Sequence, residues 1–361
     1  MINLRSLIGA DIGGKTVLLR ADLDVPLARG EISDDFRLIT SLETINYLLK
    51  QTKTMFIVGH LGRPEKEDKS LSLKVVAQWY ANKLKGNLKE VEDKGFLGWE
   101  ILPGFVLFEN LRFFKEEENP STSSGQVFSQ KLASLADIYV NDAFASSHRV
   151  HASIVGITKY LPSFAGLRLE KEVGELSKIL NNPKRPLVVI IGGAKIETKL
   201  PLVEKMHHFA DYVLIGGEIA ENDKVLLKIQ HEKITGRKSI LLVADLTEDN
   251  KDITVKSAEN FLQICQNAAT IVWNGPMGYI SENSKLKTQN SKVGDEGYTS
   301  LLLAQGITSS GAYTIVGGGD TVAFLKKNDL LDKFSFVSTG GGAMLEFLAG
   351  KKLPGLEVLM K

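Results

Sequence analysis

An α/β fold with two doubly wound parallel-sheet domains, joined by a hinge helix, is predicted by three features of the sequence. The chain has 361 residues, which is enough for two ordinary domains with separate hydrophobic cores. Strand-like runs alternate with segments of helical spacing, and this alternation predicts parallel βαβ units. In the C-terminal half, five apolar runs end in glycine, as expected where parallel strands meet a ligand-binding edge.

Composition excludes several other classes of protein. Hydrophobic residues make up 43% and charged residues 24% of the chain, which is typical of a soluble globular protein. The net charge of +1 argues against nucleic acid or an acidic membrane as a partner of the whole surface. Neither a membrane-spanning run nor a signal-peptide pattern is found, so we expect a cytoplasmic protein. The single cysteine, Cys265, cannot form a disulfide within the chain and is expected to be a buried thiol.

In the N-terminal half, strand-like runs begin the series of elements. They cover 15–26, 54–64 and 105–113, and a fourth run begins at 137 and extends to 153. A helix is expected after the capping candidates Asp34 and Asp35, because Leu38, Leu42, Ile45 and Leu49 recur at helical spacing. A second amphipathic helix is expected over 75–84, and a third over 128–136 after a loop over 115–126.

A domain boundary is expected around 163–186, a stretch that contains a helical segment, 167–180, followed by the sequence NNPKRP. We therefore predict an N-terminal domain over 1–168 and a C-terminal domain over 169–346, both Rossmann-like, with this helix as the hinge. The five glycine-ended runs follow it, namely PLVVIIGGAK, YVLIGGEIA, ATIVWNGPMG, YTIVGGGDT and FSFVSTGGGA. In a parallel sheet their turns would share one edge.

Cationic side chains are concentrated where the N-terminal strands end. These residues are Arg20, Arg37, His60, Arg63, Arg112, His148, Arg149 and His151. Their convergence at one sheet edge would make a socket for a small anionic ligand. The alternative is solvated surface charge, the usual state of any single arginine. Asp22 and Asp24 could accept hydrogen bonds from a ligand hydroxyl, although Asp24, before Val-Pro, could equally be a turn residue.

The C-terminal half offers glycines, lysines and one aspartate instead. The run 312–326 places Gly317, Gly318 and Gly319 before a helix whose N-terminus would suit a phosphate, unless the glycines only tighten a corner. Lys195 and Lys199 are four residues apart, so they share a helical face and could bridge phosphate oxygens or be surface lysines. Asp320, beside Thr321, could bind Mg²⁺ or cap the helix.

One domain is thus suited to an anionic metabolite and the other to nucleotide phosphates. Two such edges facing each other across a cleft suggest phosphoryl transfer. Closure of the domains would exclude the water that could otherwise accept the phosphoryl group.

From about Lys15 to the C-terminus the chain contains, in this order, the motifs RADLDVPL, GHLGRP, ENLRF, VNDAFASSHRVHAS, GGAKIETK, IVWNGPMG, VGGGDTVAF and VSTGGGAMLEFLAGKKLPG. This series of motifs resembles phosphoglycerate kinase. The resemblance implies a monomeric glycolytic kinase that moves phosphoryl reversibly between ATP and the carboxylate of 3-phosphoglycerate. Mg²⁺ would be the metal, ADP and 1,3-bisphosphoglycerate the other reactants, and small molecules the only implied partners.

The resemblance also implies roles for individual residues. The phosphoglycerate would be held by Asp22, Asp24, Arg37, His60, Leu61, Gly62, Arg63, Arg112 and Arg149, and transfer would be assisted by Arg37, Lys195, Gly341 and Gly342. The nucleotide would be held by Gly193, Lys195, Lys199, Gly216, Gly217, Asn274, Pro276, Glu282, Gly318, Gly319, Asp320 and Thr321, with Asp320 as the Mg²⁺ ligand. The tail, 347–361, would pack against the N-terminal domain.

Four departures from the family pattern fall mostly on the nucleotide side. Asp24 stands where the family usually has asparagine, and Glu218 stands where it has glycine against the adenine. The segment after Ala220 is shorter than usual, and Ser281 replaces a ribose-binding glutamate, with Glu282 one place later. Base preference is therefore left open. Two alternative functions also stay open: a non-catalytic phosphometabolite-binding descendant, and a kinase for another carboxylate.

Overall fold

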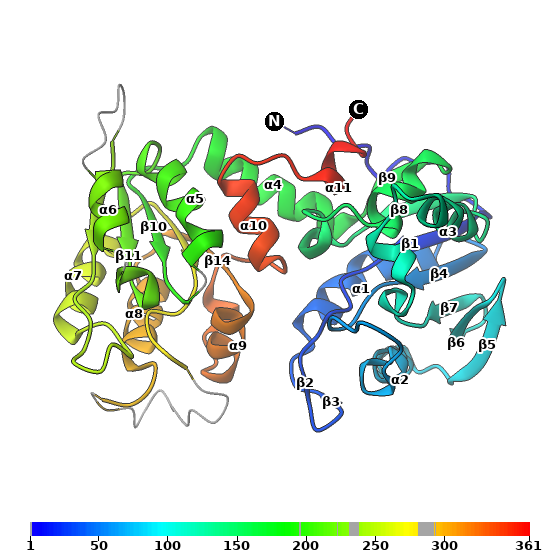
Figure 1. Cartoon of the computed structure of the whole chain (residues 1–361), viewed down its shortest axis with the longest axis horizontal. Helices are drawn as coiled ribbons and strands as arrows, with labels where there is room; N and C mark the ends of the chain where they lie inside the picture. Colours follow the sequence, from blue (N-terminus) through cyan, green and yellow to red (C-terminus); the bar gives the residue numbers. More distant parts are fainter. Residues whose placement is uncertain (1, 195, 222, 231–237, 281–291, 293) are drawn as a thin grey trace. The chain divides into compact units, whose positions relative to one another are not determined.

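The computed structural model describes residues 2–194, 196–221, 223–230, 238–280, 292 and 294–361. The chain divides into two compact units (Figure 1). Unit 1 comprises Met1–Gly174 and Lys352–Lys361, and unit 2 comprises Glu175–Lys351. Helix α4, Leu167–Asn181, corresponds to the helix expected over 167–180 and contributes residues to both units. The division therefore falls inside α4, a few residues after the boundary expected from the sequence.

Unit 1 is organised around a seven-stranded sheet with the order β5-β6-β7-β4-β1-β8-β9. Five of its strands form a continuous parallel set: β1 Thr16–Arg20, β4 Thr54–Val58, β7 Phe105–Phe108, β8 Ile138–Asn141 and β9 Ser163–Ala165. Arg20, the last residue of β1, is in register with Val58 and Asn141. The carboxyl ends of these three strands therefore lie together.

The parallel strands of unit 1 are buried on both faces, which explains their nearly continuous apolar sequences. Val17 and Leu19 belong to a core with helices α1, Phe36–Leu49, and α2, Lys74–Leu84. Leu18, which points to the other face, belongs to a core with helix α3, Ser123–Ala133. Both cores hold the sheet while leaving its carboxyl edge available for polar residues.

Two antiparallel hairpins of unit 1 were not predicted from the sequence. Strands β5, Lys89–Asp93, and β6, Phe96–Leu102, extend the sheet at one edge. Their turn residues Lys94 and Gly95 both have positive φ, 48° and 74°, which is the geometry of a two-residue hairpin turn. The small hairpin of β2, Leu27–Ala28, and β3, Glu31–Ile32, is built the same way.

Several expected strands were too long. The strands beginning near 15, 54 and 105 end at Arg20, Val58 and Phe108, and the chain beyond them is irregular or 3₁₀-helical. Helix α3 begins inside the expected loop, because the Thr122 hydroxyl accepts a hydrogen bond from Gly125 N at 3.1 Å and caps the helix. Short helical turns occupy Lys69–Leu71, Leu111–Phe113, Lys115–Glu118, Phe144–Ser146, Ala152–Gly156 and Ile157–Lys159.

Unit 2 has a six-stranded sheet with the order β12-β11-β10-β13-β14-β15, in which every pair is parallel. The prediction that the five glycine turns share one sheet edge is therefore confirmed.

Cys265, the last residue of α7, Val255–Cys265, is buried as predicted. The strands are β10 Leu187–Ile191, β11 Tyr212–Ile215, β12 Ile240–Val243, β13 Thr270–Asn274, β14 Tyr313–Gly317 and β15 Phe336–Val337. The helices are α5 Ile196–His207, α6 Asp223–Gln230, α7 Val255–Cys265, α8 Tyr298–Ser309, α9 Gly319–Lys327 and α10 Gly341–Leu348, with 3₁₀ turns Gly217–Glu221 and Leu331–Lys333.

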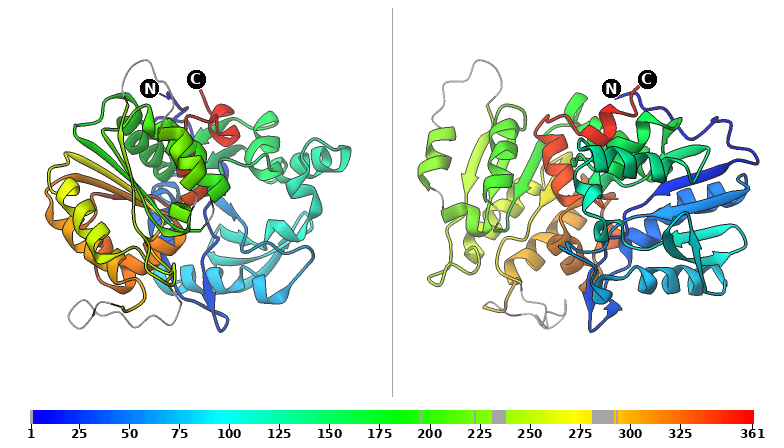
Figure 2. Two further views of the ribbon diagram at one scale, coloured as in Figure 1. Left: turned by 60° about the vertical axis from the view of Figure 1, so that its left-hand side comes forward. Right: turned by 45° about the vertical axis from the view of Figure 1, so that its right-hand side comes forward.

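The two ends of the chain lie side by side within unit 1 (Figure 2). Leu4 pairs with Met360, and Arg5 N donates to Leu359 O at 2.8 Å. Helix α11, Pro354–Glu357, is fixed by a hydrogen bond from Gly355 N to Ser147 O at 2.9 Å. Within the described ranges, no helix is long and apolar enough to cross a membrane.

Candidate functional site

In the unit 1 sheet, the direction in which successive strands are added reverses between β1 and β8. In open α/β sheets such a reversal leaves a crevice for a ligand. Because β1, β4 and β7 are parallel neighbours, the chain segments that follow these strands all begin at the carboxyl edge of this sheet. We call the polar residues gathered here the cation edge: Arg20, Asp22, Asp24, Arg37, His60 and Arg112.

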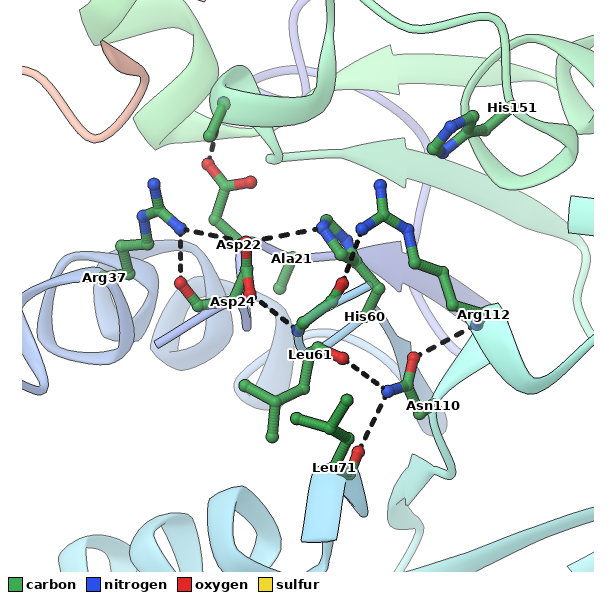
Figure 3. Close-up of polar contacts among 12 residues, drawn as sticks. Ala21, Asp22, Asp24, Arg37, His60, Leu61, Leu71, Asn110, Arg112 and His151 are labelled. Carbon is green, nitrogen blue, oxygen red and sulfur yellow. Dashed lines mark hydrogen bonds and ion pairs between the residues drawn. The ribbon is translucent and has the colours of Figure 1, made fainter. Parts of the chain in front are cut away.

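Asp24 lies at the centre of this group, between Arg37 and His60 (Figure 3). Its Oδ1 accepts a hydrogen bond from Gly62 N at 2.8 Å. Its Oδ2 lies 3.7 Å from both Arg37 Nη1 and His60 Nε2, and Arg37 Nη1 also donates to the Asp24 carbonyl. Asp24 is therefore more than a turn residue, since it joins three segments of the edge.

Arg37 is placed by the start of α1. Asp34 Oδ1 accepts a hydrogen bond from Phe36 N at 3.1 Å, so of the two expected capping residues Asp34 supports the first turn. Asp35 occupies the N-cap position without a side-chain cap, and its carboxylate instead accepts from Trp79 Nε1 at 3.2 Å. The first turn of α1 thereby directs Arg37 toward Asp24.

Arg20 and His60 form a buried pair. Arg20 is completely buried, and its Nη2 lies 2.9 Å from His60 Nδ1. Burial, and then the charges of Arg20 and Arg112, lower the pKa of His60 well below its usual 6.5. His60 is therefore neutral at physiological pH, although the sequence presents it among cations.

Asp22 is also buried and is fixed by a hydrogen bond from Ala145 N to its Oδ2 at 2.9 Å. Burial raises the pKa of Asp22, while the positive charges of Arg37 and Arg20 and the bond from Ala145 act to lower it. This bond connects the segment after β1 with the segment after β8.

Arg112 is held by Asn110, a residue that the sequence analysis did not single out. Asn110 Oδ1 accepts from Arg112 N at 3.1 Å, and its Nδ2 donates to Leu61 O at 2.8 Å. Arg112 Nη1 donates to Gly62 O at 2.5 Å, while its Nε lies 3.3 Å from Glu118 Oε1. The loop 60–62 and the turn 110–112 thus form one hydrogen-bonded unit (Figure 3).

The remaining predicted cations differ in their setting. Arg63 is exposed, and His148 and Arg149 are half-buried. His151 is buried, with its Nδ1 3.7 Å from Glu117 Oε1. Burial, followed by the charges of Arg20, Arg112 and Arg149, lowers the pKa of His151 to about 3. Like His60, His151 therefore contributes no positive charge to a ligand site at neutral pH.

The corresponding edge of unit 2 is built mainly from glycine backbone, and we call it the glycine edge: Gly192, Gly193, Gly217, Gly275 and Gly318. Four of these glycines have positive φ, namely 81° at Gly193, 63° at Gly217, 91° at Gly275 and 99° at Gly318. A Cβ at Gly275 would overlap Gly192 O, and one at Gly217 would lie 2.5 Å from Gly193 N. The close approach of these turns therefore requires glycine.

Polar side chains join the turns of the glycine edge. Lys199 is buried and its Nζ donates to Gly192 O. Gly275 N donates to Thr321 Oγ1 at 3.0 Å, which ties β13 to α9. Asn274 Nδ2 is buried and has no hydrogen-bond partner among the described residues. The predicted site residues Lys195 and Glu282, and Ser281, lie outside the described residues.

Helices α9 and α10 begin beside each other at this edge, since a Cβ at Gly341 would lie 3.0 Å from Gly318 Cα. Gly318, not Asp320, occupies the N-cap position of α9, and Asp320 lies exposed in the first turn. No cluster of three or more His, Cys, Asp or Glu side chains suited to a metal occurs in the part of the chain that the structure describes. One exposed carboxylate beside helix N-termini suits a Mg²⁺ ion whose other ligands are phosphates and water.

Comparisons with known proteins agree with this architecture. A family model described as phosphoglycerate kinase matches residues 7–251 and 223–351. A phosphoglycerate kinase of Finegoldia magna is 36% identical over 99% of both chains, and one of Borreliella afzelii is 37% identical over 96% of this chain and 97% of its own. Solved structures of phosphoglycerate kinases from Pyrococcus horikoshii and Coxiella burnetii superpose with TM-scores of 0.80 and 0.74, at 28% and 33% identity. Each covers 99% of this chain and 98% of its own.

Proposed function

The chain belongs to the phosphoglycerate kinase family, and we propose that it transfers a phosphoryl group reversibly between Mg-ATP and the carboxylate of 3-phosphoglycerate. This is the glycolytic reaction of phosphoglycerate kinase. The observation that carries the proposal is the hydrogen-bonded cation edge of unit 1, beside a family match that covers nearly the whole chain. A hinge motion at α4, a cytoplasmic location and a monomeric state belong to the same proposal.

On the phosphoglycerate side, Arg37 and Arg112 supply planar guanidinium donors to the anionic substrate. Arg37 is half-buried and linked to Asp24, and Arg112 is linked to Gly62, so both are positioned before substrate arrives. Asp22 and Asp24 would accept hydrogen bonds from the substrate hydroxyl. His60, Leu61, Gly62, Arg63 and Arg149 would complete this site.

On the nucleotide side, the N-termini of α9 and α10 would face phosphate oxygens. The buried Nδ2 of Asn274 is a donor that a phosphate oxygen could satisfy. Asp320 would bind Mg²⁺, which bridges phosphate oxygens and neutralises their charge. The other proposed nucleotide residues are Gly193, Lys195, Lys199, Gly216, Gly217, Pro276, Glu282, Gly318, Gly319 and Thr321.

The reaction needs charge neutralisation more than proton transfer. The acceptor carboxylate is already ionised at neutral pH, so no general base is required. Arg37, Lys195 and the backbone N–H groups of Gly341 and Gly342 would stabilise the transferring group and hold the reactants in line. Glu218 is exposed beside Gly217 and would lie against the base, so the preference among ATP and other nucleotides would depend on this side chain.

Trapping the acyl phosphate with hydroxylamine tests this function directly. Purified protein should form the trapped product only with both Mg-ATP and 3-phosphoglycerate, and GTP serves as a second donor. Arg37→Ala and Asp320→Ala should abolish most of the product, while the exposed-site controls Lys50→Ala and Asp332→Ala should not. A folded wild-type protein that binds phosphoglycerate and forms no product with either donor would contradict the kinase and favour a binding protein.

A further inference from the structure

A line of buried polar groups lies behind His60 and has no place in the reaction proposed above. Glu117 is completely buried in unit 1, although it comes from the charged sequence KEEEN. Its Oε1 accepts from the Ser153 hydroxyl at 2.5 Å, and its Oε2 accepts from Ser153 N at 3.0 Å. Ser153 is itself buried and lies 2.9 Å from Arg20 Nε. The line therefore runs from Glu117 through Ser153 to Arg20 and His60.

The donor and acceptor roles along this line follow from chemistry. A guanidinium group only donates hydrogen bonds. Arg20 Nε therefore donates to Ser153 Oγ, and the serine hydroxyl is left to donate to the Glu117 carboxylate. Arg20 Nη1 donates to Ala21 O at 2.6 Å, so the third arm, Nη2, must be the donor to His60 Nδ1 at 2.9 Å.

The protonation of His60 follows from the same step. Because His60 Nδ1 accepts a hydrogen bond, it cannot carry a proton, and a neutral imidazole then has its proton on Nε2. Nε2 is the nitrogen that faces Asp24 Oδ2 at 3.7 Å. The His60 ring thus presents a neutral N–H donor at the front of the cation edge, where Figure 3 shows His60 directed toward Asp24.

We propose that Glu117 and Ser153 are positioning residues that orient Arg20, and that Arg20 thereby holds His60 in the Nε2–H tautomer. The inference deepens the proposed function, because an Nε2–H donor is suited to an anionic or hydroxyl oxygen of the phosphoglycerate. With the Nδ1–H tautomer, the same ring atom would offer a lone pair to an anion and repel it. Burial raises the pKa of Glu117, while the positive charge of Arg20 and the two hydrogen bonds from Ser153 act to lower it, so Arg20 and Glu117 also interact electrostatically.

The other charged groups around His60 are consistent with this role. Arg112 and Arg37 both act electrostatically on His60, and Figure 3 shows them on opposite sides of Asp24 and His60. The neutral ring of His151 has its Nδ1 3.7 Å from Glu117 Oε1. Positive charge from three arginines disfavours an imidazolium at this position. A neutral ring with a directed N–H is therefore the form in which His60 can help to bind an anion.

The tautomer can be read on the free full-length protein with ¹⁵N-labelled histidine. Long-range ¹H–¹⁵N spectra distinguish the unprotonated nitrogen of a ring from the protonated one, and His60→Gln identifies the signal among the six histidines. At neutral pH we expect His60 to show an unprotonated Nδ1 and a protonated Nε2. An Nδ1–H tautomer, or an imidazolium, in the wild-type protein would overturn the proposal.

Two variants test the positioning step. Glu117→Gln keeps the shape but removes the charge, and Ser153→Ala removes the link to Arg20. Either change should mix the two tautomers of His60 and raise KM for 3-phosphoglycerate about 3- to 10-fold, the loss of roughly one hydrogen bond. KM for ATP should not change.

Ser129→Ala is the matched control, because Ser129 is a similarly buried serine of unit 1 whose hydroxyl donates to Gly125 O at 2.8 Å and, among the described residues, has no hydrogen bond to the Glu117–Arg20 line. It should leave the His60 spectrum and both KM values unchanged. Wild-type His60 signals that persist in both Glu117→Gln and Ser153→Ala would overturn the positioning role. Because the spectra are recorded without substrate, absence of kinase activity would contradict the proposed function and leave the tautomer result standing.

Discussion

The cation edge of unit 1 and the glycine edge of unit 2 both lie at the carboxyl ends of parallel strands. The first is formed mainly by side chains and the second mainly by glycine backbone. The cation edge consists of side chains that are hydrogen-bonded to one another or to neighbouring backbone before any ligand binds. The glycine edge consists of backbone in conformations that other residues rarely adopt. Function of the cation edge should therefore depend on side-chain chemistry, and function of the glycine edge on the absence of a Cβ.

Burial also differs between charged residues of the cation edge and the two carboxylates beside the glycine edge. Arg20, Asp22, His60 and Arg112 are buried, and breaking a buried polar group's partnership is costly. Asp320 and Glu218 are exposed. We therefore expect changes at these four residues of the cation edge to cost more stability than changes at Asp320 or Glu218, and we propose that selectivity for the acid is set within unit 1.

The largest expected effect is at Arg37. Arg37→Ala removes a preorganised cation of the phosphoglycerate site and should lower kcat/KM by about 10²- to 10³-fold, as for loss of one oxyanion donor. Arg37→Lys should be intermediate, because lysine keeps the charge and loses the planar donors. Steady-state kinetics beside Lys50→Ala, at the other end of α1, checks this. Equal activity of Arg37→Ala and Lys50→Ala would contradict the role of the cation edge.

A pair of neighbouring glycines tests the other edge. Gly318 has φ of 99°, so Gly318→Ala should cost about 1 to 3 kcal/mol of unfolding free energy. Gly319 lies in the first turn of α9 with nothing within 4 Å of an added Cβ, so Gly319→Ala should not lower stability. Both variants should raise KM for ATP, since both place a methyl group where phosphates are expected. Urea unfolding and kinetics would show this, and similar stability losses in the two variants would contradict it.

Acid should weaken unit 1 through its buried histidines. The native pKa of His151 is about 3, below the value of about 6.5 in an unfolded chain, so below pH 6.5 the unfolded state binds more protons. Stability contributed by His151 is therefore present above about pH 6.5 and falls by about 1.4 kcal/mol per pH unit below it. His151→Gln should lose less stability than the wild type between about pH 6.5 and 5.5.

Tryptophan fluorescence can restrict this measurement to unit 1. Of the three tryptophans, Trp79 and Trp99 belong to unit 1 and Trp273 to unit 2, so a Trp273→Phe background reports unit 1 alone. Urea unfolding in that background is compared with and without His151→Gln. Parallel losses of stability on acidification would show that His151 is not held neutral.

The smallest expected effect is at Asp24. Asp24→Asn removes a negative charge beside an anionic substrate, while the amide oxygen can still accept from Gly62 N. KM for 3-phosphoglycerate should fall about 2- to 5-fold, the range of a partly exposed charge pair. KM for ATP is the internal control. The amide oxygen of the Asp24→Asn variant can also accept from the substrate hydroxyl, so a rise in KM for 3-phosphoglycerate would contradict the prediction and show that this hydrogen bond requires the negative charge of the carboxylate.

The parts of the molecule that sequence predicted best are those set by strand order and local pattern. The five glycine turns follow apolar runs, so a parallel sheet must bring them to one edge. Arg20 ends β1, and Asp24 and His60 follow β1 and β4 in the same way. The hairpin of β5 and β6 was missed because its first strand is largely exposed and charged, and lacks an apolar run.

Other features depend on partners that are distant in sequence. Asn110 holds Leu61, and Glu117 holds Ser153, through contacts that no local pattern marks. Burial of His60 and His151, which removes their charge, depends on the same packing. Sequence therefore located the residues of the cation edge, while their protonation required the three-dimensional structure.

Calorimetric titration of each substrate separately, on wild type, Arg37→Ala and Gly319→Ala, measures the ligand preference of each edge directly. If one edge binds the acid by side chains and the other binds the nucleotide by backbone, Arg37→Ala weakens 3-phosphoglycerate binding and leaves Mg-ATP binding intact. Gly319→Ala should do the reverse. If each folded variant binds both ligands equally more weakly, or binds both as the wild type does, the assignment of the acid to unit 1 and the nucleotide to unit 2 would be contradicted.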